Sequence, residues 1–210
     1  AEDGIRDRDV TGVQTCALPI FETGAPGVPV ESDLVFRAAH LLADYSGQSG
    51  LGARLRVHKR LPMGAGLGGG SSDAATTLVA LNALWGLGIA TPELAALGAR
   101  LGADVPVFVM GHSAVARGIG DELEPVDLPS RWYAVVYPGI GVSTGEVFQA
   151  PELTRNSPSI TIPGFPLPGA SGAFPMGRND LEAVVVARYP AVRAALGWLG
   201  GRGGARMTGS

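Results

Sequence analysis

The feature that most constrains this chain of 210 residues is a glycine-rich segment that leads directly into an apolar stretch. Residues 61–73 read LPMGAGLGGGSSD, and residues 74–85 continue as AATTLVALNALW. An apolar stretch of this length without a polar face predicts a buried helix. Polar and apolar residues alternate over residues 54–59, which predicts a half-buried strand before the glycines. The predicted order is therefore strand, glycine loop, helix.

A glycine loop at the start of a helix is suited to bind a phosphate, because glycine lets the main chain approach closely and the helix dipole favours an anion. The Walker pattern does not fit, since it requires a lysine where Ser71 stands. Gly64, Gly66 and Gly69 fit the dinucleotide pattern, but the acidic residue at the expected distance, Glu93, belongs to a helix start and not to a second strand. A glycine turn that only allows strand and helix to pack closely is the structural alternative.

Composition limits the class of protein. Hydrophobic residues make up 46% and charged residues 17% of the chain, as in globular proteins that bury a core. A formal net charge of -3 provides no basic field for nucleic acid or for an anionic membrane. Every apolar run is interrupted before the ~20 residues that cross a bilayer. We therefore expect neither a nucleic-acid nor a membrane partner.

The first twenty residues need separate treatment. Residues 1–20 resemble one reading frame of a short-read sequencing adapter, and they lack the order of a signal peptide. We interpret them as a non-native segment. They contain Cys16, the single cysteine of the chain, so the rest has no disulfide framework and no thiolate metal site, which suits a cytoplasmic protein.

Local patterns predict the remaining elements. Thr91 is the expected cap of a helix that carries Pro92 in its first turn and ends near residue 101. Ser143 and Asn179 are each followed three residues later by glutamate, which predicts two further helix starts. The other predictions are helices over 33–45, 180–189 and 191–199, short extended pieces over 105–110 and 113–126, a strand over 132–137 and a surface loop over 151–175.

Several motifs together resemble the GHMP kinases. Residues 62–75, PMGAGLGGGSSDAA, are similar to the ATP loop of that family, and the extra glycine before SSDA is similar to its 4-diphosphocytidyl-2-C-methylerythritol-phosphorylating branch. The other matching segments are 102–108 (GADVPVF), 138–139 (PG), Thr144 with Phe148, 179–182 (NDLE) and 207–210 (MTGS), the last resembling the start of the family's second glycine loop. The resemblance covers residues 33–210.

The resemblance implies an α+β fold. A ribosomal protein S5 domain 2-like N-terminal part would occupy residues 21–126 and a ferredoxin-like part residues 127–210, both truncated. The implied activity is ATP-dependent phosphorylation of a hydroxyl of 4-(cytidine 5'-diphospho)-2-C-methyl-D-erythritol in non-mevalonate isoprenoid precursor synthesis. The family's N-terminal lysine strand is missing and its second glycine loop is cut at Ser210, so we expect the chain by itself to show little or no kinase activity.

The same resemblance assigns the site residues. Asp104 matches the catalytic base, its alternative being a local helix cap. Thr144 and Phe148 match residues of the cytidine pocket, the alternative being a helix cap and a core aromatic. Ser72 is the candidate ligand of Mg²⁺, which the chemistry of phosphoryl transfer implies. The residues assigned to ATP are Lys59, Pro62, Met63, Gly64, Ala65, Gly66, Leu67, Gly68, Gly69, Gly70, Ser71 and Ser72.

Two other functions remain open. The first is a GHMP kinase with another acceptor, such as homoserine, mevalonate or a sugar, against which the sequence GGGSSD of residues 68–73 argues. The second is a non-catalytic nucleotide-binding protein, against which Asp104 in its motif argues.

Overall fold

The computed structural model describes residues 20–23, 27–118, 120, 122–128, 130, 132–157 and 179–209. Contacts divide the chain into two compact units. Unit 1 consists of Ala1–Leu61 and Gly68–Asp127, and unit 2 of Pro62–Leu67 and Leu128–Ser210. The chain therefore passes from unit 1 to unit 2 and back within the glycine-rich segment. The segment interpreted as adapter-derived lies outside the described residues except for Ile20, where the first strand begins.

Unit 1 begins with two short parallel strands, β1 (Ile20–Thr23) and β2 (Arg54–Arg56), joined through the 3-10 turn η1 (Val30–Ser32) and helix α1 (Leu34–Ser46). The side chain of Asp33 caps α1 by accepting from Val35 N at 2.8 Å, and Gly47 ends it in the left-handed conformation. The predicted helix is confirmed. Strand β2 is shorter than the predicted 54–59, although burial alternates as expected along it.

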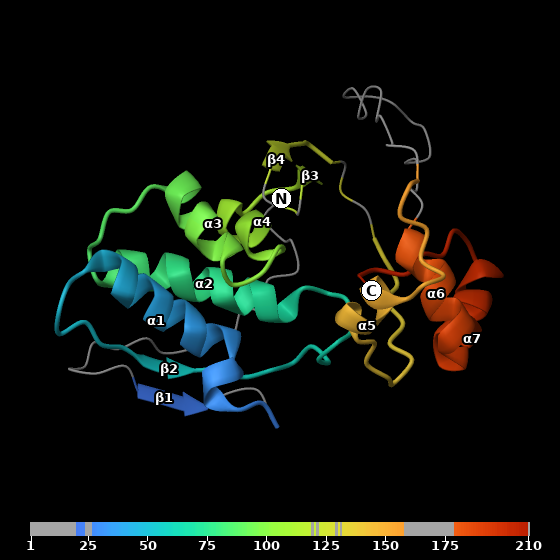
Figure 1. The fold of residues 1–210 in the computed structure, drawn as a ribbon, viewed down its shortest axis with the longest axis horizontal. Coiled ribbons are helices and arrows are strands. Elements are labelled where there is room, and N and C mark those ends of the chain that lie inside the picture. The colour runs from blue at the N-terminus through green and yellow to red at the C-terminus, as the bar shows by residue number, and fades with distance from the viewer. Residues whose placement is uncertain are drawn as a thin grey trace. The chain divides into compact units, whose positions relative to one another are not determined.

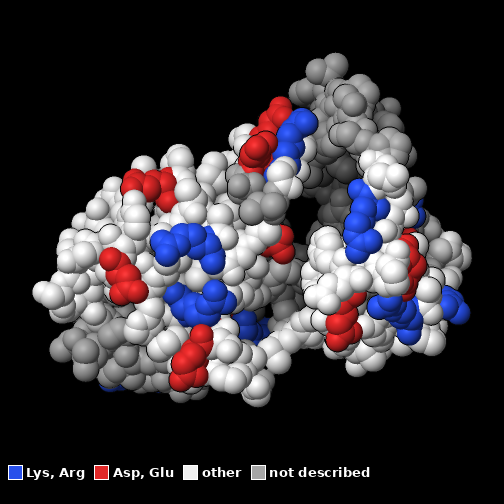
Figure 2. Space-filling view, in the orientation of Figure 1, with Lys and Arg blue, Asp and Glu red and all other residues white. Residues whose placement is uncertain are grey.

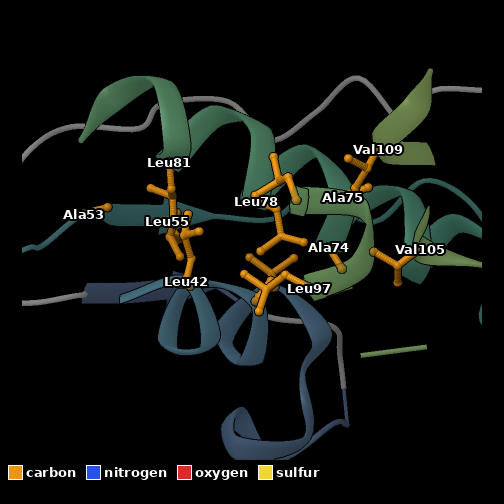
Figure 3. Packing of buried hydrophobic residues seen from close by; sticks show 14 of the residues in the cluster. Leu42, Ala53, Leu55, Ala74, Ala75, Leu78, Leu81, Leu97, Val105 and Val109 are labelled. Atoms are coloured by element: carbon orange, nitrogen blue, oxygen red, sulfur yellow. The ribbon is translucent and has the colours of Figure 1, made fainter. Parts of the chain in front are cut away.

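Three helices complete the core of unit 1: α2 (Gly69–Leu84), α3 (Thr91–Ala99) and α4 (Val105–Met110). Leu42, Leu55, Leu78 and Leu81 are fully buried where α1, β2 and α2 meet. Figure 3 shows these side chains converging with others from α3 and α4. Each buried leucine contributes roughly 1.5–3 kcal/mol relative to an exposed one. This core fixes the start of α2, and with it the end of the glycine-rich segment.

Three predictions for unit 1 need correction. Helix α2 is not buried all round, since Val79 is 45% exposed on its outer face. Thr91 is the first helical residue of α3 and not its cap, which is Ala90. Residues 105–110 form a helix and not an extended piece. A short apolar run fits either structure, and here Pro106 in the first turn and Gly111 in the left-handed conformation favour the helix.

A β-hairpin follows α4. Strands β3 (Ala114–Arg117) and β4 (Glu122–Pro125) pair in antiparallel fashion with Ala114 opposite Pro125. The predicted extended structure over 113–126 is confirmed.

Unit 2 contains α5 (Thr144–Gln149), α6 (Asp180–Arg188) and α7 (Pro190–Gly200), which confirms the helices predicted there. Their shared core consists of Val147, Ala150, Leu153, Val184, Val185 and Val192. Residues 132–137 do not form the predicted strand: no described residue pairs with them, and Trp132 is fully exposed. A strand needs a partner for its main-chain groups, which the apolar composition of one segment does not supply.

Helices and short strands thus make an α+β fold, with each unit drawn in Figure 1. On the face that Figure 2 shows, acidic and basic side chains are interspersed over both units without a large field of one sign. Among the described residues, no helix is both long and apolar enough to span a bilayer.

Candidate functional site

The glycine-rich segment takes a conformation that few other residues allow. Gly64, Gly66 and Gly68 have φ values of +69°, +69° and +68°. Such left-handed backbone is strained for residues with a Cβ atom. Helix α2 starts at Gly69 rather than near Ala74, so the second half of the glycine run belongs to the first helical turn.

The first turn of α2 presents unused hydrogen-bond donors. Ser72 N donates to Gly68 O at 2.8 Å, whereas the N–H groups of Gly69, Gly70 and Ser71 have no partner among the described residues. The hydroxyl of Ser72 also has no partner in this part of the chain, although the residue is only 3% exposed. A buried polar group of this kind is destabilising unless a ligand or water binds it. The helix start is therefore built to receive an acceptor such as a phosphate oxygen.

Close packing also requires glycine here. A Cβ atom added to Gly68 would lie 2.8 Å from Phe108 Cζ, and one added to Gly70 would lie 3.3 Å from a methyl group of Leu34. Close packing between neighbouring elements, the alternative to phosphate binding, thus explains the glycines at these two positions. It does not account for the nearby N–H groups that have no partner in the described part of the chain.

An ion pair links the two ends of the glycine-rich segment. Lys59 lies just before it, Asp73 lies in the second turn of α2, and Lys59 Nζ contacts Asp73 Oδ2. The side chain of Asp73 is 3% exposed and that of Lys59 15%. Sequence reasoning assigned Lys59 to the nucleotide but missed Asp73. A signal was present, since Lys59 is the single lysine of the chain and requires a compensating charge if buried.

Asp104 lies at the N-terminus of α4 and is exposed. Its side chain makes no capping hydrogen bond to the helix, so the alternative role as a local cap finds no support. Residues four apart lie on one helix face, which puts Asp104 one turn from Phe108, the residue in contact with Gly68. Within unit 1, Asp104 therefore lies on the side of α4 that faces the start of α2.

Thr144 and Phe148 lie four residues apart on α5 in unit 2, and therefore on one face of that helix. Phe148 is 55% exposed, so it is not a core aromatic, and the cap of α5 is Ser143 rather than Thr144. Arg155 Nη2 donates to the carbonyl oxygens of Phe148 at 2.7 Å and Ala150 at 3.1 Å, which satisfies the last turn of this short helix. Arg155 was not identified from the sequence.

The first half of the glycine loop contacts a distant segment within unit 2. Thr208 Oγ1 donates to Gly66 O at 3.0 Å across 142 positions of sequence. Asn179 Nδ2 in turn donates to Met207 O at 3.2 Å and Gly209 O at 2.9 Å. Sequence reasoning matched both segments to family motifs but did not predict their contact.

No group of three or more histidine, cysteine, aspartate or glutamate side chains that could hold a metal ion occurs among the residues that the structure describes. A metal bound here would depend on isolated ligands such as the Ser72 hydroxyl, together with oxygen atoms of a bound phosphate.

Comparison with known proteins places these features in a family. The profile of the GHMP kinases N terminal domain matches residues 33–112. A protein of Aromatoleum aromaticum named 4-diphosphocytidyl-2-C-methyl-D-erythritol kinase is 57% identical over 188 residues, covering 90% of this chain and 63% of the relative. A protein of Thiobacillus denitrificans with the same name is 53% identical, covering 91% and 66%.

A solved structure agrees with these sequence matches. The crystal structure of a 4-(cytidine 5'-diphospho)-2C-methyl-D-erythritol kinase superposes with a TM-score of 0.65 at 36% sequence identity. The match covers 88% of this chain and 66% of that structure. The chain thus spans slightly less than two thirds of the length of the relatives it matches.

Proposed function

Because this chain belongs to the GHMP kinase family, we propose that the protein is a small-molecule kinase acting on 4-(cytidine 5'-diphospho)-2-C-methyl-D-erythritol. It would transfer the γ-phosphoryl group of ATP to a hydroxyl of this acceptor, a step in isoprenoid precursor synthesis, in the cytoplasm. The names of relatives that are 53% and 57% identical over about nine tenths of the chain support the choice of acceptor.

The nucleotide-binding part of the proposal is supported mainly by the hydrogen-bond donors at the start of α2 that have no partner among the described residues. The amides of Gly69, Gly70 and Ser71 and the buried Ser72 hydroxyl offer donors to phosphate oxygens at the positive end of a helix dipole. An ammonium group has three donors, so Lys59 can contact a phosphate while it pairs with Asp73. Residues 62–72 and Lys59 together form the proposed ATP site.

Asp104 is the proposed catalytic base. The hydroxyl oxygen of the acceptor forms a bond to the γ-phosphorus while the bond from that phosphorus to the β–γ bridging oxygen breaks, which releases ADP. The proton of the hydroxyl passes to the Asp104 carboxylate. An exposed carboxylate that makes no capping hydrogen bond to its own helix supports this role.

Mg²⁺ is the proposed metal, and when bound it would neutralise charge on the phosphates. The Ser72 hydroxyl fits as a ligand because it is buried and has no partner among the described residues. Phosphate oxygens and water would supply the other ligands, as is usual for a cation that keeps part of its hydration shell.

Thr144 and Phe148 are the proposed contacts of the cytidine group. The half-exposed ring of Phe148 offers a flat apolar face on which a pyrimidine base can stack. Thr144 lies one turn away on the same face of α5. A polar and an aromatic side chain thus lie one helical turn apart on this face.

The test uses a chimera in which residues 21–210 replace the matched region of the Aromatoleum aromaticum relative. We expect ATP-dependent phosphorylation of 4-(cytidine 5'-diphospho)-2-C-methyl-D-erythritol and none of homoserine or mevalonate. Asp104→Asn should reduce kcat by about 100-fold or more with ATP affinity retained. The control Asp127→Asn, an exposed carboxylate in the same unit, should leave both unchanged.

Each alternative function predicts a different result. Turnover of homoserine or mevalonate alone would keep the family and reject the proposed acceptor. ATP binding that is unaffected by Asp104→Asn, without turnover of any acceptor, would favour a non-catalytic nucleotide-binding protein.

A further inference from the structure

We propose that Asn179, assisted by Glu182, is a positioning residue that holds residues 207–209 against Gly66 and so fixes the first half of the proposed ATP loop. The inference rests on the proposed function, because it concerns the loop assigned to the phosphates. It adds two residues at the start of α6 to the set on which nucleotide binding depends. Neither residue contacts the loop itself.

The amide of Asn179 joins two segments of unit 2. Its Oδ1 accepts from Leu181 N at 3.0 Å and thereby caps α6. Its Nδ2 donates to Met207 O at 3.2 Å and Gly209 O at 2.9 Å. Three of the four hydrogen-bonding positions of this side chain are thus used, and only one of them serves the helix.

Glu182 provides a further hydrogen bond to residues 207–209. In a capping box its carboxylate would accept from the main chain of the cap residue. Here Glu182 Oε2 accepts from Met207 N at 2.9 Å instead. A carboxylate is a stronger acceptor than a neutral carbonyl, and the side chain of Met207 packs against the core of unit 2. The N–H, the C=O and the side chain of Met207 are therefore all anchored.

The anchored segment determines the conformation of Gly66. Thr208 Oγ1 donates to Gly66 O at 3.0 Å. A Cβ atom added to Gly66 would lie 2.1 Å from Thr208 O, and one added to Gly209 would lie 2.6 Å from Gly66 Cα. The two main chains approach so closely that both positions require glycine. Any displacement of residues 207–209 must therefore move Gly66 or break its hydrogen bond.

The chemistry of Asn179 allows its two roles to be separated. Asn179→Asp and Asn179→Ser both keep a good helix cap but lose the donors to Met207 and Gly209. The aspartate also places a carboxylate against two carbonyl oxygens, whereas the serine adds no charge. Asn82→Asp is the matched control, because Asn82 makes a similar pair of hydrogen bonds to the main chain of Ile89 within unit 1.

The experiment uses the whole chain and four readouts. The amide resonance of Gly66 should shift in both Asn179 variants, and the Met207 amide should exchange with solvent faster than in the wild type. ATP affinity, measured by calorimetry, should fall by about 10-fold, as expected for the loss of two hydrogen bonds that preorganise the loop. The urea midpoint of unfolding should change little, since α6 keeps its cap.

The outcomes distinguish this inference from the proposed function. If Gly66 and Met207 respond no more than in Asn82→Asp, the positioning role is refuted. A change at Gly66 with unchanged ATP affinity would refute its importance for the nucleotide. If the wild type binds no ATP while Gly66 and Met207 respond, the contact is supported and its role in binding ATP by this chain is refuted, whereas the proposed function fails only if the chimera also binds no ATP.

Discussion

Replacing Lys59 with methionine should destabilise unit 1 much more than removal of an exposed charge. The Asp73 carboxylate, with a side chain 3% exposed, would lose the cation that contacts it, while methionine fills much of the space of the lysine stem. Removal of one partner leaves the other charge in a medium that solvates it poorly. The effect arises from the loss of this ion pair at a buried carboxylate and not from lost packing.

The expected loss is about 3–5 kcal/mol of unfolding free energy, the usual range when one member of a buried pair is removed. We expect the lower end, because the Lys59 side chain is 15% exposed and water already reaches part of the pair. Such a loss is a substantial fraction of the roughly 5–15 kcal/mol that stabilises a typical domain. Adding Asp73→Asn to Lys59→Met should recover at least about half of it, since no buried charge would remain.

The assay is urea unfolding followed by the fluorescence of Trp85. Trp85 packs against the core of unit 1, and its Nε1 donates to Gly52 O at 3.1 Å. Trp132→Phe and Trp198→Phe remove the two other tryptophans, which belong to unit 2. Arg37→Met is the control, because it removes an exposed positive charge from α1 in the same unit.

The reasoning fails if Lys59→Met and Arg37→Met have the same small effect, because the ion pair would then contribute nothing measurable. It also fails if the double variant is no more stable than Lys59→Met alone. Lys59→Arg keeps the charge with a different shape, so it should retain more stability than Lys59→Met.

Three further predictions concern other parts of the chain. Gly68→Ala should lower stability by about 1–3 kcal/mol and weaken ATP binding, because the left-handed position has no room for a Cβ atom; unchanged melting and affinity would contradict this. Leu78→Ala should cost about 2–5 kcal/mol at a fully buried position, whereas Val79→Ala at a 45% exposed one should change stability by at most ~0.5 kcal/mol, both measured by urea unfolding. The pKa of Glu152 is lowered by a hydrogen bond from its own main-chain N–H and by Arg188. Because the folded pKa of Glu152 lies below that of the unfolded chain, the ionised carboxylate stabilises the fold fully above the unfolded pKa and loses this effect as the pH falls through the folded pKa. The stability difference between wild type and Glu152→Gln should therefore shrink as the pH falls below the ordinary glutamate range, and a difference that persists unchanged in strong acid would refute this.

The elements predicted correctly are those whose signals lie within a few residues. Asp33, Ser143 and Asn179 each cap a helix by accepting from an amide two or three positions later. Gly47 ends α1 for an equally local reason, its positive φ. Such contacts form wherever the chain is helical, so the sequence pattern alone identifies them.

The elements predicted wrongly depend on partners elsewhere in the chain. Residues 105–110 are apolar throughout, so their pattern fits a buried helix and a buried strand equally well. The helix is favoured by Pro106 and Gly111 at its ends and by packing of α4 against α2 and α3. Residues 132–137 are apolar and aromatic as a buried strand is, yet no described residue supplies the main-chain groups that would pair with them. In both segments the apolar pattern alone did not decide the structure.

The candidate site divides in the same way. The sequence by itself determined the glycine loop and the helix after it, because left-handed turns and unpaired amides follow from glycine and from the geometry of a helix start. Only the tertiary structure decided that Lys59 pairs with Asp73 and that Thr208 contacts Gly66 across 142 residues. The physical reason is that a contact between segments distant in sequence depends on the packing of the elements that carry them, and no local pattern encodes that distance.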